Sequence, residues 1–225
     1  MTKEELIALT PSYNHEKLES LMEITLSTNE KFNLTAIKEP CDFRELMIYD
    51  SLLPLKHFSF DDKNILDVGT GAGFPGLPLA ISSRGKFTLL DSTKKKIDHI
   101  NNVVKELEIN NVISVNARVE ELAHEHKEEF DYVIARAVAS LPILIELCLP
   151  LCKVGGYFLA MKSTKADEEI KNSQNALKKL NGEISDVYID TLPSGEQRNL
   201  IVIKKIKVSN NKYPRRYEQI KRLPL

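Results

Sequence analysis

The spacing of hydrophobic positions changes along the chain near residue 61. Before that point apolar residues recur every three or four positions, as on the buried face of a helix. One such face carries Leu18, Leu21, Met22 and Leu26. We expect Asn14 to cap this helix, because Asn accepts hydrogen bonds from the first free backbone N–H groups.

Two further helices are predicted in the same region. Thr2-Lys-Glu-Glu5 is a capping-box pattern for a first helix. A third helix is expected after Pro40, with Phe43, Leu46, Met47 and Leu53 turned inward. The segment 33–37 interrupts the helices.

After Asp61 the pattern becomes an alternation of apolar strands and helices. This alternation predicts a mostly parallel sheet covered on both faces. We expect strands at 63–68, 86–90, 112–116, 131–135, 156–162, 184–191 and 199–206, and helices at 75–83, 94–108, 140–152 and 166–180.

The last two expected strands have only the turn segment 192–197 between them, so they should form an antiparallel hairpin. The usual dinucleotide-binding fold lacks that hairpin, and the sheet of methyltransferases that use S-adenosylmethionine (SAM) has it. We therefore predict an α/β, Rossmann-like class I SAM-dependent methyltransferase sheet of seven strands. The expected organisation is a helical region over 1–60, the SAM-binding domain over 61–208 and a basic tail over 209–225.

The composition indicates the class of protein and the compartment. The chain has 225 residues, of which 42% are hydrophobic and 28% charged, as in ordinary globular proteins. No apolar run is long enough for a membrane span, and the N-terminus lacks a signal-peptide pattern. The three cysteines cannot all pair, which fits a reducing compartment. We expect a cytoplasmic monomer without membrane or metal partners.

The net charge of −1 gives no overall attraction to nucleic acid, but the end of the chain is basic. Residues 212–225 hold Lys212, Arg215, Arg216, Lys221 and Arg222 against Glu218 alone. Such a segment suits a polyanionic partner bound at one face. A solvated tail explains the composition equally well.

The segment Asp67-Val-Gly69-Thr-Gly71-Ala-Gly73-Phe-Pro-Gly76 is the richest in chemical information. A buried strand followed by a glycine turn and a helix binds the polar part of a nucleotide-like cofactor. The spacing also matches the NAD fingerprint. Asp67 favours SAM, because its carboxylate attracts the cationic amine of SAM and repels a phosphate.

Further cofactor contacts are expected at the ends of the next strands. Asp91 lies 20 residues after Gly71, where an acid that binds ribose hydroxyls belongs; a helix cap is the alternative. The backbone of Val119 and Glu120 should lie near the adenine, unless this is an ordinary surface loop. Arg136 ends the fourth strand, where the reacting atom of the substrate should lie, and is a candidate for orienting it. We assign no acid or base catalyst.

The motifs that the chain lacks are consistent with an acceptor that needs no base. No Asp/Asn-Pro-Pro motif of base-amine methyltransferases follows the fourth strand. The single Pro-Cys pair, at Cys41, precedes the cofactor region, and Cys148 and Cys152 fit a core helix better than a metal site. Guanine N7 has a lone pair and no proton, so its methylation needs alignment rather than a base. In RNA that edge is accessible only when the base is unpaired or exposed.

The motifs together resemble a known family. They are Asn33-Leu-Thr-Ala-Ile37, Tyr49-Asp-Ser-Leu52, the glycine segment 67–76, Asp91-Ser92, Arg136-Ala137 and Lys212-Tyr-Pro-Arg215. In these motifs the chain is similar to the RsmG family of bacterial small-subunit (16S) ribosomal RNA guanine-N7 methyltransferases, also called glucose-inhibited division protein B. The resemblance covers nearly the whole chain.

The resemblance implies SAM as cofactor, 16S rRNA or the 30S particle as partner, and direct in-line methyl transfer to guanine N7. The family's cofactor contacts fall on Gly69, Phe74, Val119, Glu120 and Arg136. The basic residues that we expect to meet RNA are Arg118, Lys162, Lys212, Arg215 and Arg216. Met47 stands where the family often has His, and the tail after residue 216 departs from the family pattern.

Two other functions remain open from the sequence. The neutral net charge suits a SAM-dependent methyltransferase of a small molecule or protein. A non-catalytic ribosome-binding module on the same fold is a further alternative, which predicts no SAM binding.

Overall fold

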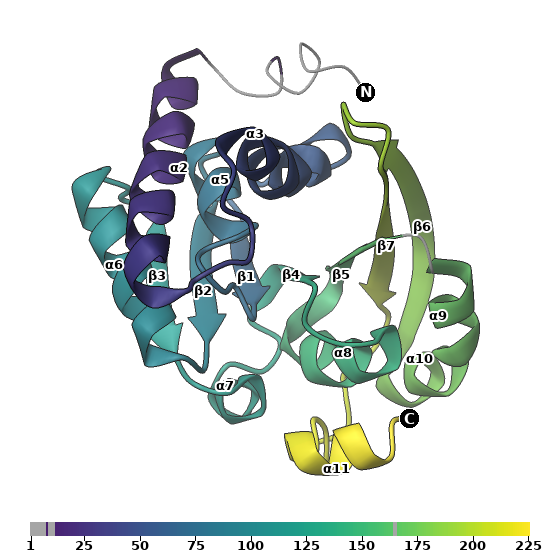
Figure 1. The fold of residues 1–225 in the computed structure, drawn as a ribbon. Helices are drawn as coiled ribbons and strands as arrows, with labels where there is room; N and C mark the ends of the chain where they lie inside the picture. Colours follow the sequence, from purple (N-terminus) through teal and green to yellow (C-terminus); the bar gives the residue numbers. More distant parts are fainter. Residues whose placement is uncertain (1–7, 9–11, 164–165) are drawn as a thin grey trace.

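A computed structural model describes residue 8 and residues 12–163 and 166–225, and the predicted capping box at Thr2–Glu5 lies outside this part. Seven strands form one sheet in the order β3-β2-β1-β4-β5-β7-β6 (Figure 1). Pairs up to β5 are parallel, and β7 is antiparallel to both β5 and β6, as the sequence predicted. The strands are β1 Asn64–Val68, β2 Lys86–Asp91, β3 Val112–Asn116, β4 Phe130–Arg136, β5 Cys152–Lys162, β6 Gly182–Thr191 and β7 Gln197–Lys205.

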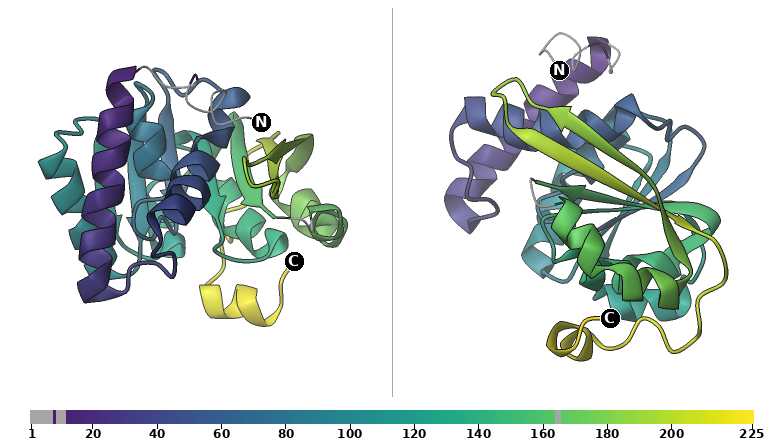
Figure 2. Two further views of the ribbon diagram at one scale, coloured as in Figure 1. Left: turned by 45° about the horizontal axis from the view of Figure 1, so that its top comes forward. Right: turned by 90° about the vertical axis from the view of Figure 1, so that its right-hand side faces the viewer.

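Helices cover both faces of this sheet (Figures 1 and 2). On one face lie α2 Ser12–Phe32, α5 Gly76–Ile81, α6 Lys94–Glu106 and the helical run α3 Pro40–Phe43, a π-helix Arg44–Tyr49, α4 Asp50–Leu52 and a 3-10 turn Leu53–Lys56. On the other lie α7 Val119–Glu125, α8 Leu141–Cys148, α9 Ala166–Asn172, α10 Gln174–Leu180 and α11 Tyr217–Arg222, with a 3-10 turn Leu149–Leu151 after α8.

The sheet separates two hydrophobic cores because neighbouring residues of a strand point to opposite faces. Ile65 belongs to the core under α2, α5 and α6, whereas Leu66 belongs to the core under α8 and α10. Leu21 and Phe43 from the first 60 residues share the first of these cores. The helical region therefore packs as part of the sheet domain, and its boundary near residue 60 stays a prediction.

The expected helical faces in the first 60 residues are largely confirmed. Leu18, Leu21, Met22, Phe43 and Leu53 are buried, while Leu26, Leu46 and Met47 are half-buried. The capping role of Asn14 was wrong: this residue lies inside α2, which is already helical at Ser12.

Three local predictions also differ from the structure. The expected helix 166–180 is divided at Ser173, whose hydroxyl donates to the Glu169 carbonyl at 2.7 Å, a bond that competes with the helix ladder. The expected loop at 116–121 contains the start of helix α7 at Val119, where the Glu121 side chain accepts from the Arg118 N–H at 3.0 Å. The basic tail contains the short helix α11.

Candidate functional site

The glycine turn joins β1 to α5 at the point where the strand order reverses between β1 and β4. Open α/β sheets bind ligands at such a point, outside the carboxyl ends of the strands. Gly71 has φ +62°, and a Cβ placed on it would meet nothing within 4 Å, so its backbone borders open space. At Gly76 a Cβ would lie 2.1 Å from Leu89 Cδ2, so only glycine lets α5 approach β2 this closely.

Asp67 is buried beneath this turn and is 1% exposed. Its Oδ2 accepts hydrogen bonds from the Thr70 hydroxyl at 2.6 Å and the Gly76 N–H at 2.8 Å. Its Oδ1 is buried and has no hydrogen-bond partner among the described residues. Burial raises the pKa of Asp67 to about 6. The carboxylate thus holds the turn in shape, and the predicted contact between Asp67 and a ligand amine stays a prediction.

Asp91 ends β2 and connects the glycine turn to helix α6. Its Oδ2 accepts from the Gly71 N–H at 3.0 Å, and its Oδ1 accepts from the Thr93 N–H at 2.8 Å. Lys96 Nζ lies 3.6 Å from Oδ2. Each carboxylate oxygen has two lone pairs, so these contacts leave acceptor capacity for a hydroxyl. Asp91 therefore supports the chain at the start of α6, and its predicted contact with ribose hydroxyls stays a prediction.

Two pockets adjoin at the carboxyl ends of the strands and share Gly69, Lys96 and Ala137. The smaller pocket measures 360 Å³ and is lined by Asp91, Val119, Glu120 and Tyr217 among others. The larger pocket measures 690 Å³ and extends from the glycine turn and Phe74 to the terminal hairpin. The two pockets form one crevice. All the cofactor contacts predicted from the sequence line it, except Asp67 and Gly73.

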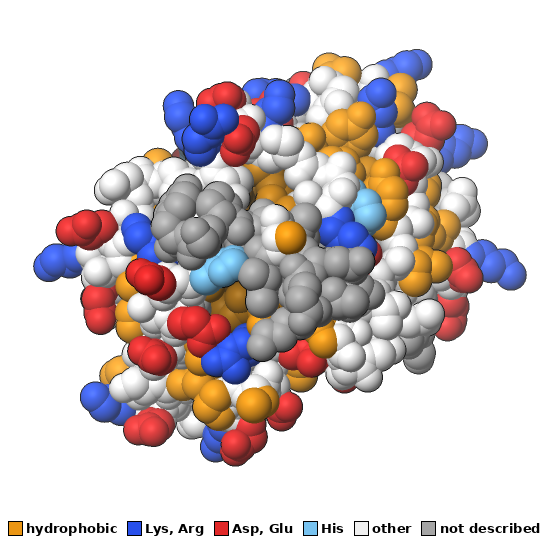
Figure 3. All heavy atoms as spheres, turned by 90° about the horizontal axis from the view of Figure 1, so that it is seen from above, with side chains coloured by type: hydrophobic (Ala, Val, Ile, Leu, Met, Phe, Trp, Pro, Cys, Tyr) orange, Lys and Arg blue, Asp and Glu red, His pale blue; other side chains and the backbone are white. Residues whose placement is uncertain are grey.

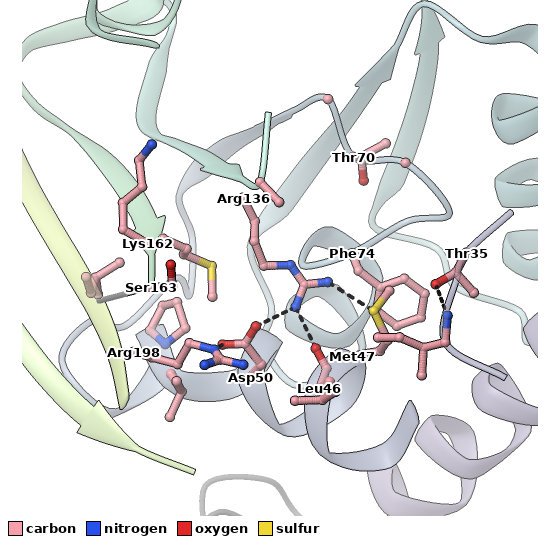
Figure 4. Close-up of a pocket in the computed structure, with 18 of the residues that line it drawn as sticks. Thr35, Leu46, Met47, Asp50, Thr70, Phe74, Arg136, Lys162, Ser163 and Arg198 are labelled. Atoms are coloured by element: carbon pink, nitrogen blue, oxygen red, sulfur yellow. Dashed lines mark hydrogen bonds and ion pairs between the residues drawn. The ribbon is translucent and has the colours of Figure 1, made fainter. Parts of the chain in front are cut away.

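Linked ion pairs line the larger pocket. Arg136 Nη1, from the end of β4, donates to Asp50 Oδ2 at 2.9 Å and to the Leu46 carbonyl at 3.2 Å. Arg198 Nε, from β7, lies 3.3 Å from Asp50 Oδ1. Figure 4 shows Asp50 between the two guanidinium groups, with Met47, Phe74 and Thr35 on one side of Arg136 and Lys162 and Ser163 on the other. Asp50 therefore connects three segments that are distant in the sequence.

The π-helix explains how the helical segment reaches Arg136. The Asp50 N–H donates to the Glu45 carbonyl, five residues back, as π-helix pairing requires. In this segment the Leu46 carbonyl accepts from Arg136 Nη1, and Met47 Sδ lies 3.6 Å from Arg136 Nη2. Met47 therefore faces the guanidinium as an apolar, polarizable neighbour.

Lys162 is not a free cation for RNA in this structure. Its ammonium group lies 2.8 Å from Glu169 Oε2 and donates to the Ala139 carbonyl at 2.6 Å, and the side chain is 10% exposed. Glu169 also accepts from the Leu141 N–H at 2.6 Å. The ion pair ties β5, α8 and α9 together at the wall of the larger pocket, and the RNA contact expected at Lys162 stays a prediction.

The basic tail has a structural as well as a surface part. Arg215 makes a two-pronged ion pair with Glu146, at 2.7 and 2.6 Å, and Glu146 is fully buried in α8. Arg215 therefore anchors the tail to α8, and the RNA contact expected at this residue stays a prediction. Lys212 Nζ lies 5.2 Å from the ring centre of Tyr213, and Arg216 is exposed. Tyr217, which the sequence did not single out, brings the tail to the smaller pocket.

Arg118 is exposed at the start of α7, with its guanidinium 4.0 Å from Glu120. On the face shown in Figure 3, basic and acidic side chains are interspersed around the periphery. On this face the cations therefore form only small local groups.

The cysteines take no part in the crevice. Cys148 and Cys152 are buried, which raises the pKa of both thiols, that of Cys152 to about 12, and Cys41 is exposed on α3. Within the described ranges, neither pocket is lined by a cysteine or a histidine. The described residues also contain no cluster of His, Cys, Asp and Glu suited to a metal ion, and no helix among them is long and apolar enough to cross a bilayer.

The residues present fit a SAM-sized ligand. Gly71 borders open space, and Asp91, which keeps acceptor capacity, lines the crevice, while the orphaned Asp67 oxygen lies buried beneath the glycine turn. A carboxylate suits sugar hydroxyls, and an unpaired buried carboxylate oxygen suits an ammonium group. Asp50, Arg136 and Arg198 form a charged side of the larger pocket.

Sequence reasoning found Arg136 but missed its partners. Asp50 stood within a quoted motif, Tyr49-Asp-Ser-Leu52, without a role, and Arg198 carried no signal. No local spacing links positions 50, 136 and 198; only the sheet order and the docking of the helical segment bring them together.

Comparisons with known proteins agree with this geometry. The family model GidB, described as rRNA small subunit methyltransferase G, matches residues 14–201. A Fusobacterium nucleatum protein named "Ribosomal RNA small subunit methyltransferase G" is 44% identical over 219 residues, 95% of this chain and 94% of that protein. A protein of the same name from Alkaliphilus metalliredigens is 43% identical over 206 residues, 89% and 86% of the two chains.

Solved structures with low sequence identity share the fold. TYW2 of M. jannaschii in complex with AdoMet has a TM-score of 0.56 and 18% identity over 66% of this chain and 72% of that one. A SAM-dependent methyltransferase from Aquifex aeolicus has a TM-score of 0.56 and 18% identity over 72% and 92%. The predicted class I methyltransferase fold is thus confirmed.

Proposed function

Because this chain belongs to the GidB family, rRNA small subunit methyltransferase G, we propose that it transfers the methyl group of SAM to N7 of a guanine in 16S ribosomal RNA. The observation that carries the proposal is the single crevice at the carboxyl ends of β1, β2 and β4. One part of it has groups that suit SAM, and the adjoining part is lined by charged side chains and measures 690 Å³.

The proposed cofactor site uses residues from both pockets. Asp91 would accept hydrogen bonds from the ribose hydroxyls, and the backbone of Val119 and Glu120 would border the adenine. The turn Gly69–Gly73 with Phe74 would hold the methionine part, with the free oxygen of Asp67 toward its amine. When bound, SAM supplies a methyl group on a positively charged sulfur.

The residues of the larger pocket would align the guanine and exclude water. N7 carries no proton, so the acceptor needs no base, and a thiol is not among the residues that line the crevice in the described part of the chain. Methylation leaves a positive charge on the purine. Asp50 balances Arg136 at 2.9 Å, so the arginine can orient a ligand without presenting an uncompensated positive charge to that purine.

We further propose that 16S rRNA or the 30S particle is bound by a monomer, with no metal ion and with the guanine unpaired. Lys212, Arg216 and Arg118 are the exposed cations that we assign to phosphate contacts.

The decisive experiment incubates the protein with tritiated SAM and 30S subunits from a strain that lacks this modification. We expect label at one guanine of 16S rRNA, and strand cleavage specific for N7-methylguanine should locate it. Label on an exocyclic amine or on protein would contradict the proposal and favour the other methyltransferase classes. Absence of SAM binding by calorimetry would leave only a non-catalytic binding module.

A further inference from the structure

The larger pocket contains four carboxylates, and one of them differs from the rest. Asp50 is held by Arg136 and Arg198, and Asp190 by Lys56 and by His57 at 2.9 Å. Glu169 is held by Lys162 and the Leu141 N–H. The Glu196 carboxylate is engaged only by Arg198, at 2.8 Å, among the contacts of the described residues, and its side chain is 55% exposed.

Arg198 is the cation beside this carboxylate, and it retains donor capacity. Its Nε faces Asp50, its Nη2 faces Glu196, and its Nη1 donates to the Gln197 carbonyl at 3.1 Å. A guanidinium group has five N–H donors, so one N–H on each Nη remains for a ligand. Arg198 and Glu196 thus present a donor next to an acceptor at the wall of the pocket.

The hairpin that carries this pair is fixed to the opposite wall at several points. The Ser194 N–H donates to Glu45 Oε1 at 2.7 Å, and Arg198 reaches Asp50 across the pocket. His57 pairs with Asp190 and stacks on Tyr188, with ring centres 3.8 Å apart. These contacts hold the hairpin, and with it Glu196 and Arg198, in one position before a substrate arrives.

We propose that Arg198 and Glu196 recognise the Watson–Crick edge of the acceptor guanine. This inference rests on the proposed function. The Arg198 guanidinium donates to O6, and the Glu196 carboxylate accepts from the N1–H and N2–H groups, which lie next to O6 on that edge. Recognition through this edge leaves N7 on the other side of the ring free for methyl transfer.

The same pair rejects adenine. Adenine presents an amine where guanine has O6 and a lone pair where guanine has N1–H. The amine would face the guanidinium and the lone pair would face the carboxylate, so both contacts would be lost. A site built to hydrogen-bond a polar group discriminates strongly against an analogue that lacks it.

Inosine in place of the acceptor guanine tests the pairing, because inosine keeps O6 and N1–H but lacks the N2 amine. The templates are 30S subunits reconstituted with 16S rRNA carrying guanine or inosine at the labelled position. For the wild type we expect kcat/KM to be about tenfold lower on inosine. Glu196→Ala should lower kcat/KM on guanine about tenfold and show no further loss on inosine. Arg198→Lys should lower kcat/KM by the same factor on both templates, because O6 is present in guanine and in inosine.

Matched variants separate this role from a structural one. Glu183→Ala removes an exposed glutamate at the other end of the same hairpin, and Arg84→Lys changes an exposed arginine paired with Asp61. Both should behave as the wild type, and calorimetry should give every variant the wild-type Kd for SAM within about twofold.

The outcomes distinguish the two proposals. If the wild type places no label on guanine N7, the proposed function fails and the recognition pair fails with it. If the wild type labels N7 but treats guanine and inosine alike, or if Glu196→Ala keeps the wild-type preference, only the recognition pair is overturned.

Discussion

The two parts of the crevice are built in different ways. Around the smaller pocket, Gly69, Asp91 and Val119 lie at or shortly after the carboxyl ends of three successive strands, β1, β2 and β3. In the larger pocket, Asp50, Arg136 and Arg198 come from a helical segment, the fourth strand and the terminal hairpin. Apart from Tyr217 of the tail, the residues named for the first part are placed by local geometry, whereas the second part depends on the docking of distant segments.

This difference means that changes in the two parts should have separable effects. A change in the smaller pocket should weaken SAM binding and leave the remainder of the protein intact. A change in the larger pocket should disturb methyl transfer, and removal of its central carboxylate should also weaken the fold.

The largest effect is expected for Asp50→Asn. The change leaves two mostly buried guanidinium groups without their shared counter-charge. We expect the free energy of unfolding in urea to fall by about 3 kcal/mol, and methyl transfer to 30S subunits to fall on the order of a hundredfold because the acceptor is misplaced. The control Asp98→Asn breaks an exposed pair with Lys94 and should change stability by less than about 1 kcal/mol. Equal losses in both variants would contradict the special role of the larger pocket.

The pH dependence of stability should identify Asp67 as a buried acid. Burial raises its pKa from 3.8 to about 6, so the folded protein binds a proton between these values that the unfolded chain has released. The stability due to this group is therefore complete below about pH 4 and is lost as the pH rises to about 6, by about 3 kcal/mol. The difference in unfolding free energy between wild type and Asp67→Asn, measured across pH 4 to 7, should show this fall.

Asp61 provides a control of opposite sign. A hydrogen bond from the Arg84 backbone lowers the pKa of this exposed carboxyl, so its contribution should be lost as the pH falls. The prediction for Asp67 fails if the difference in unfolding free energy between wild type and Asp67→Asn rises with increasing pH. Such a rise would mean that the surroundings of Asp67 stabilise its charged form.

Asp91→Ala should weaken SAM binding by about 2 kcal/mol, about thirtyfold in Kd, because a charged acceptor for two hydroxyls is lost. Calorimetry measures this directly. Asp91→Asn keeps an acceptor for the Thr93 N–H and should lose less. If Asp91→Ala binds SAM normally and only the unfolding free energy falls, by about 1 kcal/mol, Asp91 acts as a local support of α6 alone.

The smallest effect is expected in the tail. Arg216→Ala removes an exposed cation, so binding to 30S subunits should weaken a few-fold. The slope of the logarithm of the binding constant against the logarithm of salt concentration should become shallower by the amount expected for about one phosphate contact. The free energy of unfolding should not change. Arg215→Ala should instead destabilise the protein, since it leaves Glu146 buried without its partner. Filter binding over a range of KCl concentrations, with urea unfolding, separates the two. A stability loss with Arg216→Ala would show that the whole tail is structural.

The sequence by itself determined the sheet, the glycine turn and the positions of Asp91, Val119, Glu120 and Arg136 along the crevice. These follow from strand periodicity and from short-range spacing, because the carboxyl ends of parallel strands meet at one edge of a sheet. The tertiary structure alone decided that Asp50 holds Arg136 and Arg198, that Lys162 and Arg215 are anchors, and that Tyr217 reaches the smaller pocket. A charged side chain carries the same letter whether it is solvated or paired. Its partner is set by how distant segments dock, which no local pattern records.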